Sequence, residues 1–130
     1  MTEPAWISRE LAIAIHRRQL TEHGGLDGIR DSGMLDSALS RPRNLLAYSE
    51  DPPDLASLAA AYAFGVARNH PFIDGNKRTA YVVCRTFLLL NDADMTAEKD
   101  DRYRMFLALA AGSLSESELG QWLRDQLKPA

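Results

Sequence analysis

The sequence predicts one all-α domain over residues 1–130, with about six helices and a glycine-rich flap near residues 23–31. Three observations lead to this prediction. Apolar residues recur at helical spacing in long segments, Ser or Asp residues stand where most of these segments begin, and glycine or proline residues separate them. With 130 residues, 45% of them hydrophobic, the chain is large enough to bury one real core.

The first part of the chain predicts two helices separated by the flap. Ser8 is a good N-cap for a helix that runs to about Leu20. Four glycines between residues 24 and 33 forbid a helix there and favour an irregular or hairpin-like excursion. A short helix from Ser32 to Ser40 should end near Arg41, because a proline disfavours helical geometry in the residue before it.

Two buried helices are predicted in the middle of the chain. Asp54 is a plausible N-cap for a helix from Leu55 to Asn69, whose alanines let neighbouring helices approach closely. This helix should stop at His70, since a proline follows. A further helix from Gly75 or Asn76 to about Leu90 has apolar residues nearly all round its axis, which is typical of a buried helix.

The remainder of the chain predicts two more helices. Residues 91–94 break the helical pattern, and Thr96 opens the next helix. Ser115 and Glu118 form a capping-box pattern for the last helix, which carries apolar residues as far as Leu127.

The overall composition argues against several classes of protein. A net charge of −3 and a pI near 5.6 disfavour a nucleic-acid footprint over the surface, without excluding a local cationic pocket. One cysteine, Cys84, cannot form an internal disulfide, and its apolar surroundings fit a buried, inert thiol. The chain carries no signal-peptide pattern and no apolar stretch near the roughly 18 residues of a membrane span. We therefore expect a cytoplasmic protein without direct nucleic-acid or membrane binding.

The most informative stretch is residues 70–78, His-Pro-Phe-Ile-Asp-Gly-Asn-Lys-Arg, which we call the motif turn. The helix that follows presents unpaired backbone N–H groups, and its dipole favours anions there. Gly75 lets a phosphate approach the backbone, and Asn76 can donate to a phosphate oxygen. Lys77 and Arg78 add positive charge. The motif turn thus predicts a phosphate site.

Asp74 and His70 add chemistry to this site. A carboxylate beside an anion fits if a divalent cation such as Mg²⁺ lies between them. His70 is the one good proton acceptor at neutral pH in the cluster. Taken alone, each residue more often has an ordinary explanation as a turn, a helix stop or a solvated helix start. The set of five within nine residues favours activation of a hydroxyl that attacks phosphorus.

The motif turn resembles the signature of the Fic/Doc (Fido) superfamily, and Lys77 resembles the Doc, or death-on-curing, branch of toxins. The resemblance extends over nearly the whole chain. It includes the segment from Leu35 to Pro42 and these flap residues: Gly25, Leu26, Asp27, Gly28, Ile29 and Arg30.

The resemblance implies a small all-α domain that transfers part of a nucleotide to a protein hydroxyl. His70 would be the general base, Phe72 would point into the core, and Asp74 would hold Mg²⁺. The catalytic phosphate cradle would consist of Gly75, Asn76, Lys77 and Arg78. The flap would pair with an extended target segment by strand addition.

Two departures from the wider Fic pattern bear on the reaction. Fic adenylyltransferases have Gly where Lys77 stands, and a second Arg where this chain has Tyr81; Arg85, one helical turn further on, could partly substitute. The resemblance to Doc implies a kinase that transfers the γ-phosphate of ATP to a Ser or Thr of a translation factor, with elongation factor Tu as the expected target. An AMP-transferring enzyme and a catalytically silent nucleotide- or partner-binding module stay open as alternatives.

A regulatory element common in Fic proteins is missing from the sequence. No Ser or Thr has Glu four positions later, so the chain lacks the inhibitory Ser/Thr-x-x-x-Glu helix. Inhibition would then come from another chain. The resemblance implies a separate antitoxin of the prevents-host-death type, whose C-terminal segment folds onto an exposed apolar groove of the toxin.

A few further residues carry expectations about packing. His16 is expected to be a partly exposed residue of the first helix, and Arg68 either supports the site or pairs with an acid. Trp6, Tyr48 and Trp122 are expected to pack rather than to stack on a base. Three well-separated histidines and one cysteine give no zinc pattern.

Overall fold

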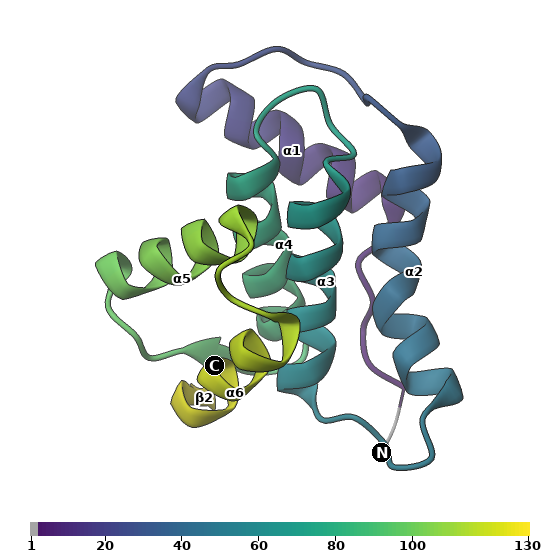
Figure 1. Cartoon of the computed structure of the whole chain (residues 1–130), viewed down its shortest axis with the longest axis vertical. Coiled ribbons are helices and arrows are strands. Elements are labelled where there is room, and N and C mark those ends of the chain that lie inside the picture. The colour runs from purple at the N-terminus through teal and green to yellow at the C-terminus, as the bar shows by residue number, and fades with distance from the viewer. Residues whose placement is uncertain (1–2) are drawn as a thin grey trace.

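The computed structural model describes residues 3–130, and within them the all-α prediction is confirmed: six helices and one small two-stranded sheet (Figure 1). The helices are α1 (Arg9–His23), α2 (Ser32–Tyr48), α3 (Leu55–Asn69), α4 (Asn76–Leu90), α5 (Lys99–Ala111) and α6 (Glu116–Gln126). The strands are β1 (Ala93–Met95) and β2 (Leu127–Pro129), which pair antiparallel with Asp94 opposite Lys128.

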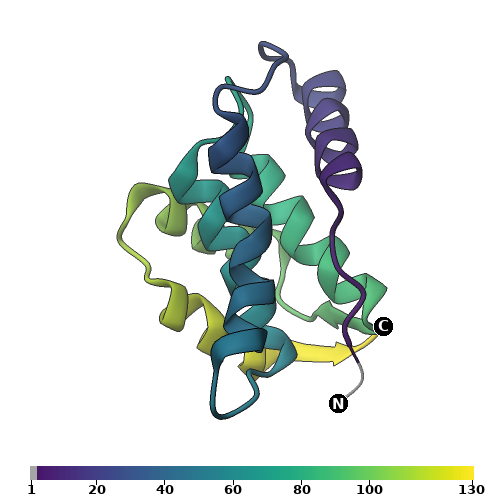
Figure 2. The ribbon, with the colours of Figure 1, turned by 90° about the vertical axis from the view of Figure 1, so that its right-hand side faces the viewer.

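Helix α3 lies at the centre, with α2, α4 and α6 packed on it and α5 in contact (Figures 1 and 2). Most of its side chains are buried, and many are alanine, so its neighbours come close. Gly65 marks a close approach, because a Cβ there would lie 3.0 Å from Cα of Ala38 in α2. This packing fixes the end of α3, and therefore the position of the motif turn that follows it.

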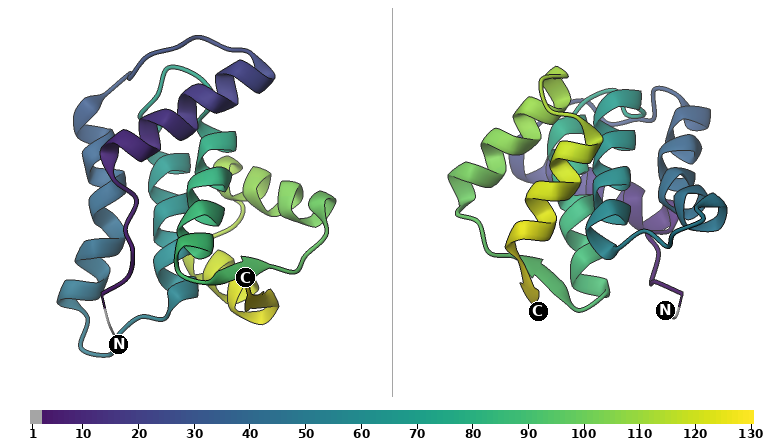
Figure 3. Two further views of the ribbon diagram at one scale, coloured as in Figure 1. Left: turned by 180° about the vertical axis from the view of Figure 1, so that it is seen from behind. Right: turned by 60° about the horizontal axis from the view of Figure 1, so that its bottom comes forward.

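Helix α1 lies across α4 near the motif turn (Figure 3). The chain leaves α1 at Gly24, passes over the motif turn as the flap and enters α2. The flap and the motif turn, about forty residues apart in sequence, thus lie together at one end of the molecule (Figures 1 and 2).

The predicted N-caps are all confirmed. Ser8 Oγ accepts from Leu11 N at 3.1 Å, and Asp54 Oδ1 accepts from Ser57 N at 2.9 Å. At α6, Ser115 forms the complete capping box with its partner three residues later. Short polar side chains at helix starts satisfy N–H groups that would otherwise lack acceptors, so these boundaries are local properties of the sequence.

The predicted end of the second helix near Arg41 is wrong, because α2 continues through Pro42 to Tyr48. Pro42 is buried, and Leu39 and Leu45 on either side of it pack into the core. A proline inside a helix removes one main-chain hydrogen bond and is locally unfavourable. Burial of apolar side chains against α3 outweighs this local preference.

The C-terminal region differs from the prediction in two boundaries and in a small sheet that the sequence pattern does not predict. Helix α5 begins at Lys99 rather than Thr96, and Leu127 belongs to β2 rather than to the last helix. The N–H of Thr96 donates to the Gln126 carbonyl at 2.9 Å, which joins the two segments beside the sheet. Strands of three residues are too short to show a periodic signal, so the sequence pattern misses them.

Side-chain burial agrees with most expectations. Cys84 is buried, which raises the pKa of its thiol, and Trp6 and Trp122 pack against the core. Tyr48, by contrast, is 84% exposed, so the expectation that it packs is wrong. It is the last residue of α2. None of the helices in residues 3–130 is long and apolar enough to cross a membrane.

Candidate active site

The motif turn begins and ends with left-handed backbone. His70 caps the C-terminus of α3 with φ 48° and ψ 56°, and Gly75 precedes α4 with φ 78°. Left-handed geometry is inexpensive for glycine but uncommon for other residues. His70 therefore has a backbone conformation that its surroundings impose, and its side chain is exposed at the surface.

Asn76 closes the motif turn on itself. Its buried side-chain amide accepts from Phe72 N at 3.0 Å and donates to Phe72 O at 2.9 Å. Phe72 is buried as the resemblance implies. Because the Asn76 amide is engaged within the turn, its predicted contact with phosphate would come from its backbone N–H rather than from its side chain.

His16 is buried, so the expectation that it is a partly exposed residue of the first helix is wrong. It is 1% exposed, and its ring stacks on Phe72 with centroids 3.8 Å apart and planes 6° apart. Its Nε2 lies 2.8 Å from the backbone carbonyl oxygen of Asp74. The motif turn covers the ring of His16 on this face of α1. A signal was present in the sequence, since the buried residues of α1 recur at helical spacing: Ala12, Ile15, His16 and Gln19.

The N-terminus of α4 is open to an anion. No side chain caps it, and within residues 3–130 the backbone N–H groups of Asn76, Lys77 and Arg78 have no acceptor. The side chains of Lys77 and Arg78 are exposed beside these donors. Free donors, the helix dipole and two cations together favour a phosphate at this point.

Asp74 lies exposed next to that helix end, and main-chain donors orient its carboxylate. Oδ1 accepts from Gly75 N at 3.1 Å and Oδ2 from Leu26 N at 3.3 Å. The part of the chain that the structure describes has no cluster of three His, Cys, Asp or Glu that could enclose a metal. A single carboxylate beside a phosphate site fits Mg²⁺, which usually takes one or two protein carboxylates together with substrate phosphates.

The flap is not a hairpin of its own; it pairs with the motif turn. Ile73 N donates to Gly28 O at 3.0 Å and Arg30 N donates to Pro71 O at 2.8 Å, which makes an antiparallel bridge between Ile29 and Phe72. In this pattern the bridge residue turns its own N–H and C=O away from the partner strand. Within residues 3–130 the N–H and C=O of Ile29 have no hydrogen-bond partner, so Ile29 presents a free main-chain edge on the flap.

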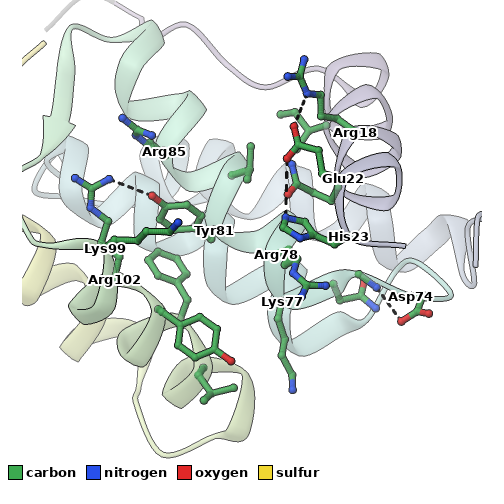
Figure 4. Close-up of a pocket in the computed structure, with 18 of the residues that line it drawn as sticks. Arg18, Glu22, His23, Asp74, Lys77, Arg78, Tyr81, Arg85, Lys99 and Arg102 are labelled. Atoms are coloured by element: carbon green, nitrogen blue, oxygen red, sulfur yellow. Dashed lines mark hydrogen bonds and ion pairs between the residues drawn. The ribbon is translucent and has the colours of Figure 1, made fainter. Parts of the chain in front are cut away.

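A cleft of about 1400 Å³ extends from the motif turn between α1, α4 and α5 (Figure 4). Its charged lining has six cations, Arg18, Lys77, Arg78, Arg85, Lys99 and Arg102, against three carboxylates, Glu22, Asp74 and Glu98. Between these cations lie exposed apolar side chains of α5, Tyr103 and Leu107. The chain as a whole is acidic, so this cleft is the local cationic pocket that composition left open.

Several of these cations are already paired inside the protein. Arg85 donates to both carboxylate oxygens of Asp94 at 3.1 Å, which raises the pKa of Arg85 and lowers that of Asp94. Arg102 donates to the Tyr81 hydroxyl at 3.2 Å (Figure 4). The Asp94 pair uses Nε and Nη2 of Arg85, and within residues 3–130 its Nη1 makes no hydrogen bond, so the geometry leaves open whether Arg85 serves as the second arginine of the Fic pattern.

Arg68 lies outside this site. Its guanidinium stands 5.5 Å from the ring centroid of Phe64, which Arg41 also covers at 4.7 Å. Arg41 in turn donates to Glu116 at 3.0 Å. These contacts join α2, α3 and α6. Among residues 3–130 Arg68 pairs with no acid and does not line the cleft, so neither expected role is seen.

A match to the Fic/DOC family covers residues 6–88, from just before α1 to the last turn of α4. The chain belongs to the Fic/DOC family. One relative, named Toxin Doc, from Mycolicibacterium smegmatis, is 42% identical over 77 residues, which are 59% of each chain. Another, named Protein kinase doc, from Escherichia phage P1, is 33% identical over 118 residues, 91% of this chain and 92% of its own. Both relatives are Doc proteins, which confirms the resemblance to the Doc branch.

Proposed function

We propose that this chain is a Doc-type toxin, a protein kinase that transfers the γ-phosphate of ATP to a Ser or Thr hydroxyl of a translation factor. One observation carries the proposal: an exposed histidine, an oriented carboxylate and an open helix N-terminus meet in the motif turn, beside a basic cleft. The relatives named Toxin Doc and Protein kinase doc support it.

In this proposal the phosphates of ATP bind at the N-terminus of α4. The backbone N–H groups of Asn76, Lys77 and Arg78 donate to phosphate oxygens, and the two cationic side chains offset the negative charge. Gly75 has no side chain that would obstruct them. A Mg²⁺ ion on Asp74 would supply further neutralisation of phosphate charge.

His70 is proposed to act as the general base. Its imidazole accepts the proton of the target hydroxyl while that oxygen forms a bond to the γ-phosphorus. The bond between the γ-phosphorus and the β,γ-bridging oxygen breaks, and ADP leaves with the electron pair. Since phosphoryl transfer needs positioning and charge stabilisation more than covalent chemistry by the protein, a base and a cradle suffice.

Lys77 is the residue on which the choice between phosphate and AMP transfer depends. A long cation at this position would obstruct the seat that the α- and β-phosphates occupy when AMP is transferred. We therefore infer that ATP binds with its γ-phosphate toward His70. Fic-type AMP transfer is the alternative, and a Lys77→Gly variant would be expected to move toward it.

The target is proposed to dock on the flap as an added strand. The free N–H and C=O of Ile29 offer one main-chain edge, and Leu26, Ile29 and Ile73 expose apolar side chains around it. The expected target by resemblance to the family is elongation factor Tu, which would place the reaction in the cytoplasm.

The inhibitory partner is proposed to be a separate antitoxin of the prevents-host-death type. The cleft between α1, α4 and α5 offers it a groove in which apolar side chains, such as Tyr103 and Leu107, lie among basic ones. An amphipathic helix with acidic flanks would suit this lining, and it would also cover Arg78.

The proposal is tested with purified protein, Mg²⁺, γ-labelled ATP and a bacterial extract. Wild type should label one protein, and His70→Ala should reduce labelling by about 10²–10⁴-fold with an unchanged circular dichroism spectrum. Arg17→Met, which removes only an exposed ion pair of 4.0 Å with Asp27, serves as the control and should label normally. Undiminished labelling by His70→Ala would refute the proposed role.

Growth arrest distinguishes the enzyme from a silent binding module. An enzyme should lose toxicity with His70→Ala. Arrest that survives this change but is lost when Ile29 is altered would instead indicate that the chain acts by binding alone.

A further inference from the structure

Arg30 of the flap donates hydrogen bonds to the C-terminal end of α3, where the proposed base His70 lies. Its Nε donates to the carbonyl oxygen of His70 at 2.6 Å, and its Nη2 donates to that of Asn69 at 2.7 Å. Its backbone N–H donates to Pro71 at 2.8 Å. One residue of the flap therefore binds three successive carbonyls of the chain around His70.

These contacts act where the backbone needs support. The last carbonyls of α3 have no intrahelical donors, and they carry the negative end of the helix dipole. A planar guanidinium with two parallel donors suits adjacent carbonyls better than a lysine ammonium does. His70 lies in the left-handed region, with φ 48°, at the same point. The guanidinium thus fixes the His70 carbonyl in the orientation that the left-handed backbone gives it.

We propose that Arg30 is a positioning residue that holds the backbone of His70 in its left-handed conformation and couples the base to the flap. The proposal rests on the proposed function in that it takes His70 to be the base. Arg30 directly follows Ile29, whose outward edge is the proposed docking strand. A target paired at Ile29 would hold Arg30 in place, and Arg30 would in turn hold His70. The base would therefore be correctly placed when a target is present.

The geometry predicts a specific kinetic effect. The contacts of Arg30 go to residues 69–71 and none goes to the helix N-terminus at residues 75–78. Loss of the guanidinium should therefore misplace the base while the phosphate site stays intact. Small misplacements of catalytic groups lower turnover by about 10²-fold.

The test compares Arg30→Met, Arg30→Lys and the control Arg17→Met, which loses a different contact between α1 and the flap. Arg30→Met should lower kcat by about 10- to 100-fold with the KM for ATP within about twofold of wild type. Arg30→Lys, with a single ammonium, should recover part of kcat. Arg17→Met should match wild type. A wild-type kcat in Arg30→Met, or a change in the KM for ATP alone, would overturn the proposal.

A second measurement does not depend on enzymatic activity, and it can be made on variants that are less stable than wild type. The carbonyl ¹³C chemical shift of His70, measured by NMR, reports the hydrogen bond that this oxygen accepts. It should move in Arg30→Met and Arg30→Lys and stay unchanged in Arg17→Met. If wild type labels no protein, the proposed function fails, while this chemical shift still shows whether Arg30 holds the His70 carbonyl. A His70 shift unaffected by both Arg30 variants would overturn the positioning role.

Discussion

His16 offers the sharpest test of how the fold positions the motif turn. Its side chain makes two separable contacts, a ring stack on Phe72 at 3.8 Å and a hydrogen bond to the Asp74 carbonyl at 2.8 Å. His16→Phe keeps the stack but removes the donor. His16→Gln keeps a donor at a similar reach and removes the ring. The two variants thus separate the contribution of the ring stack to stability from that of the hydrogen bond.

The expected losses follow from these contacts. In His16→Phe the part-buried Asp74 carbonyl loses its side-chain donor, which should lower the free energy of unfolding by about 1–3 kcal/mol. In His16→Gln the lost aromatic contact should cost about 0.5–1.5 kcal/mol. His16→Ala loses both contacts and leaves a cavity, so we expect roughly 3–5 kcal/mol, the range for large aromatic side chains.

Urea unfolding at 25 °C measures these differences, and γ-label transfer under native conditions measures their effect on the site. His16→Phe should also slow transfer by about tenfold or more, because the carbonyl that it releases belongs to the residue proposed to hold Mg²⁺. The rate of γ-label transfer by His16→Gln should stay closer to that of wild type. If both variants unfold within about 0.5 kcal/mol of wild type, His16 does not support the motif turn as argued.

Three further substitutions test other parts of the structure. Gly25→Ala places a Cβ 3.1 Å from Asp74 Oδ2 at a φ of +124°, so it should disturb the carboxylate and weaken Mg²⁺-dependent ATP binding measured by calorimetry. Gly65→Ala should lower the free energy of unfolding by about 1–3 kcal/mol, since its Cβ would meet α2 backbone; a neutral result in urea would contradict the close packing. Asp54→Ala should cost about 1 kcal/mol at pH 7 through the lost N-cap of α3. Arg124 lowers the pKa of Asp54, so this cost should persist at and above pH 5 and shrink as pH falls below about 4; a cost that grows in acid would refute the assignment.

The sequence predicts those features that neighbouring residues determine. The caps at Ser8, Asp54 and Ser115 depend on residues three positions away, and the structure has all of them. The motif turn is found between two buried helices because Pro71 ends one helix locally and Gly75 begins the next. Local chemistry of this kind is visible in one short window of sequence.

Features that depend on distant contacts are not predicted. Pro42 stays inside α2 because that helix packs on α3. Helix α3 is too far along the chain for the residues around Pro42 to reveal this contact. His16 becomes a support of the motif turn only because the fold brings α1 over residues 58 positions away. Asn76 is a plausible phosphate donor by residue type, but the folded turn engages its amide with Phe72. In each case tertiary packing decides between roles that the residue type alone leaves open.

If the motif turn directs phosphoryl transfer, the transferred label must come from the γ-phosphate of ATP. Wild-type protein is incubated with Mg²⁺ and a translating bacterial extract, with ATP labelled in parallel at the α- or the γ-phosphate. Label on protein from γ-labelled ATP alone is the predicted result, and the labelled band would identify the target. Label from α-labelled ATP would mean nucleotidyl transfer and would contradict the role given to Lys77.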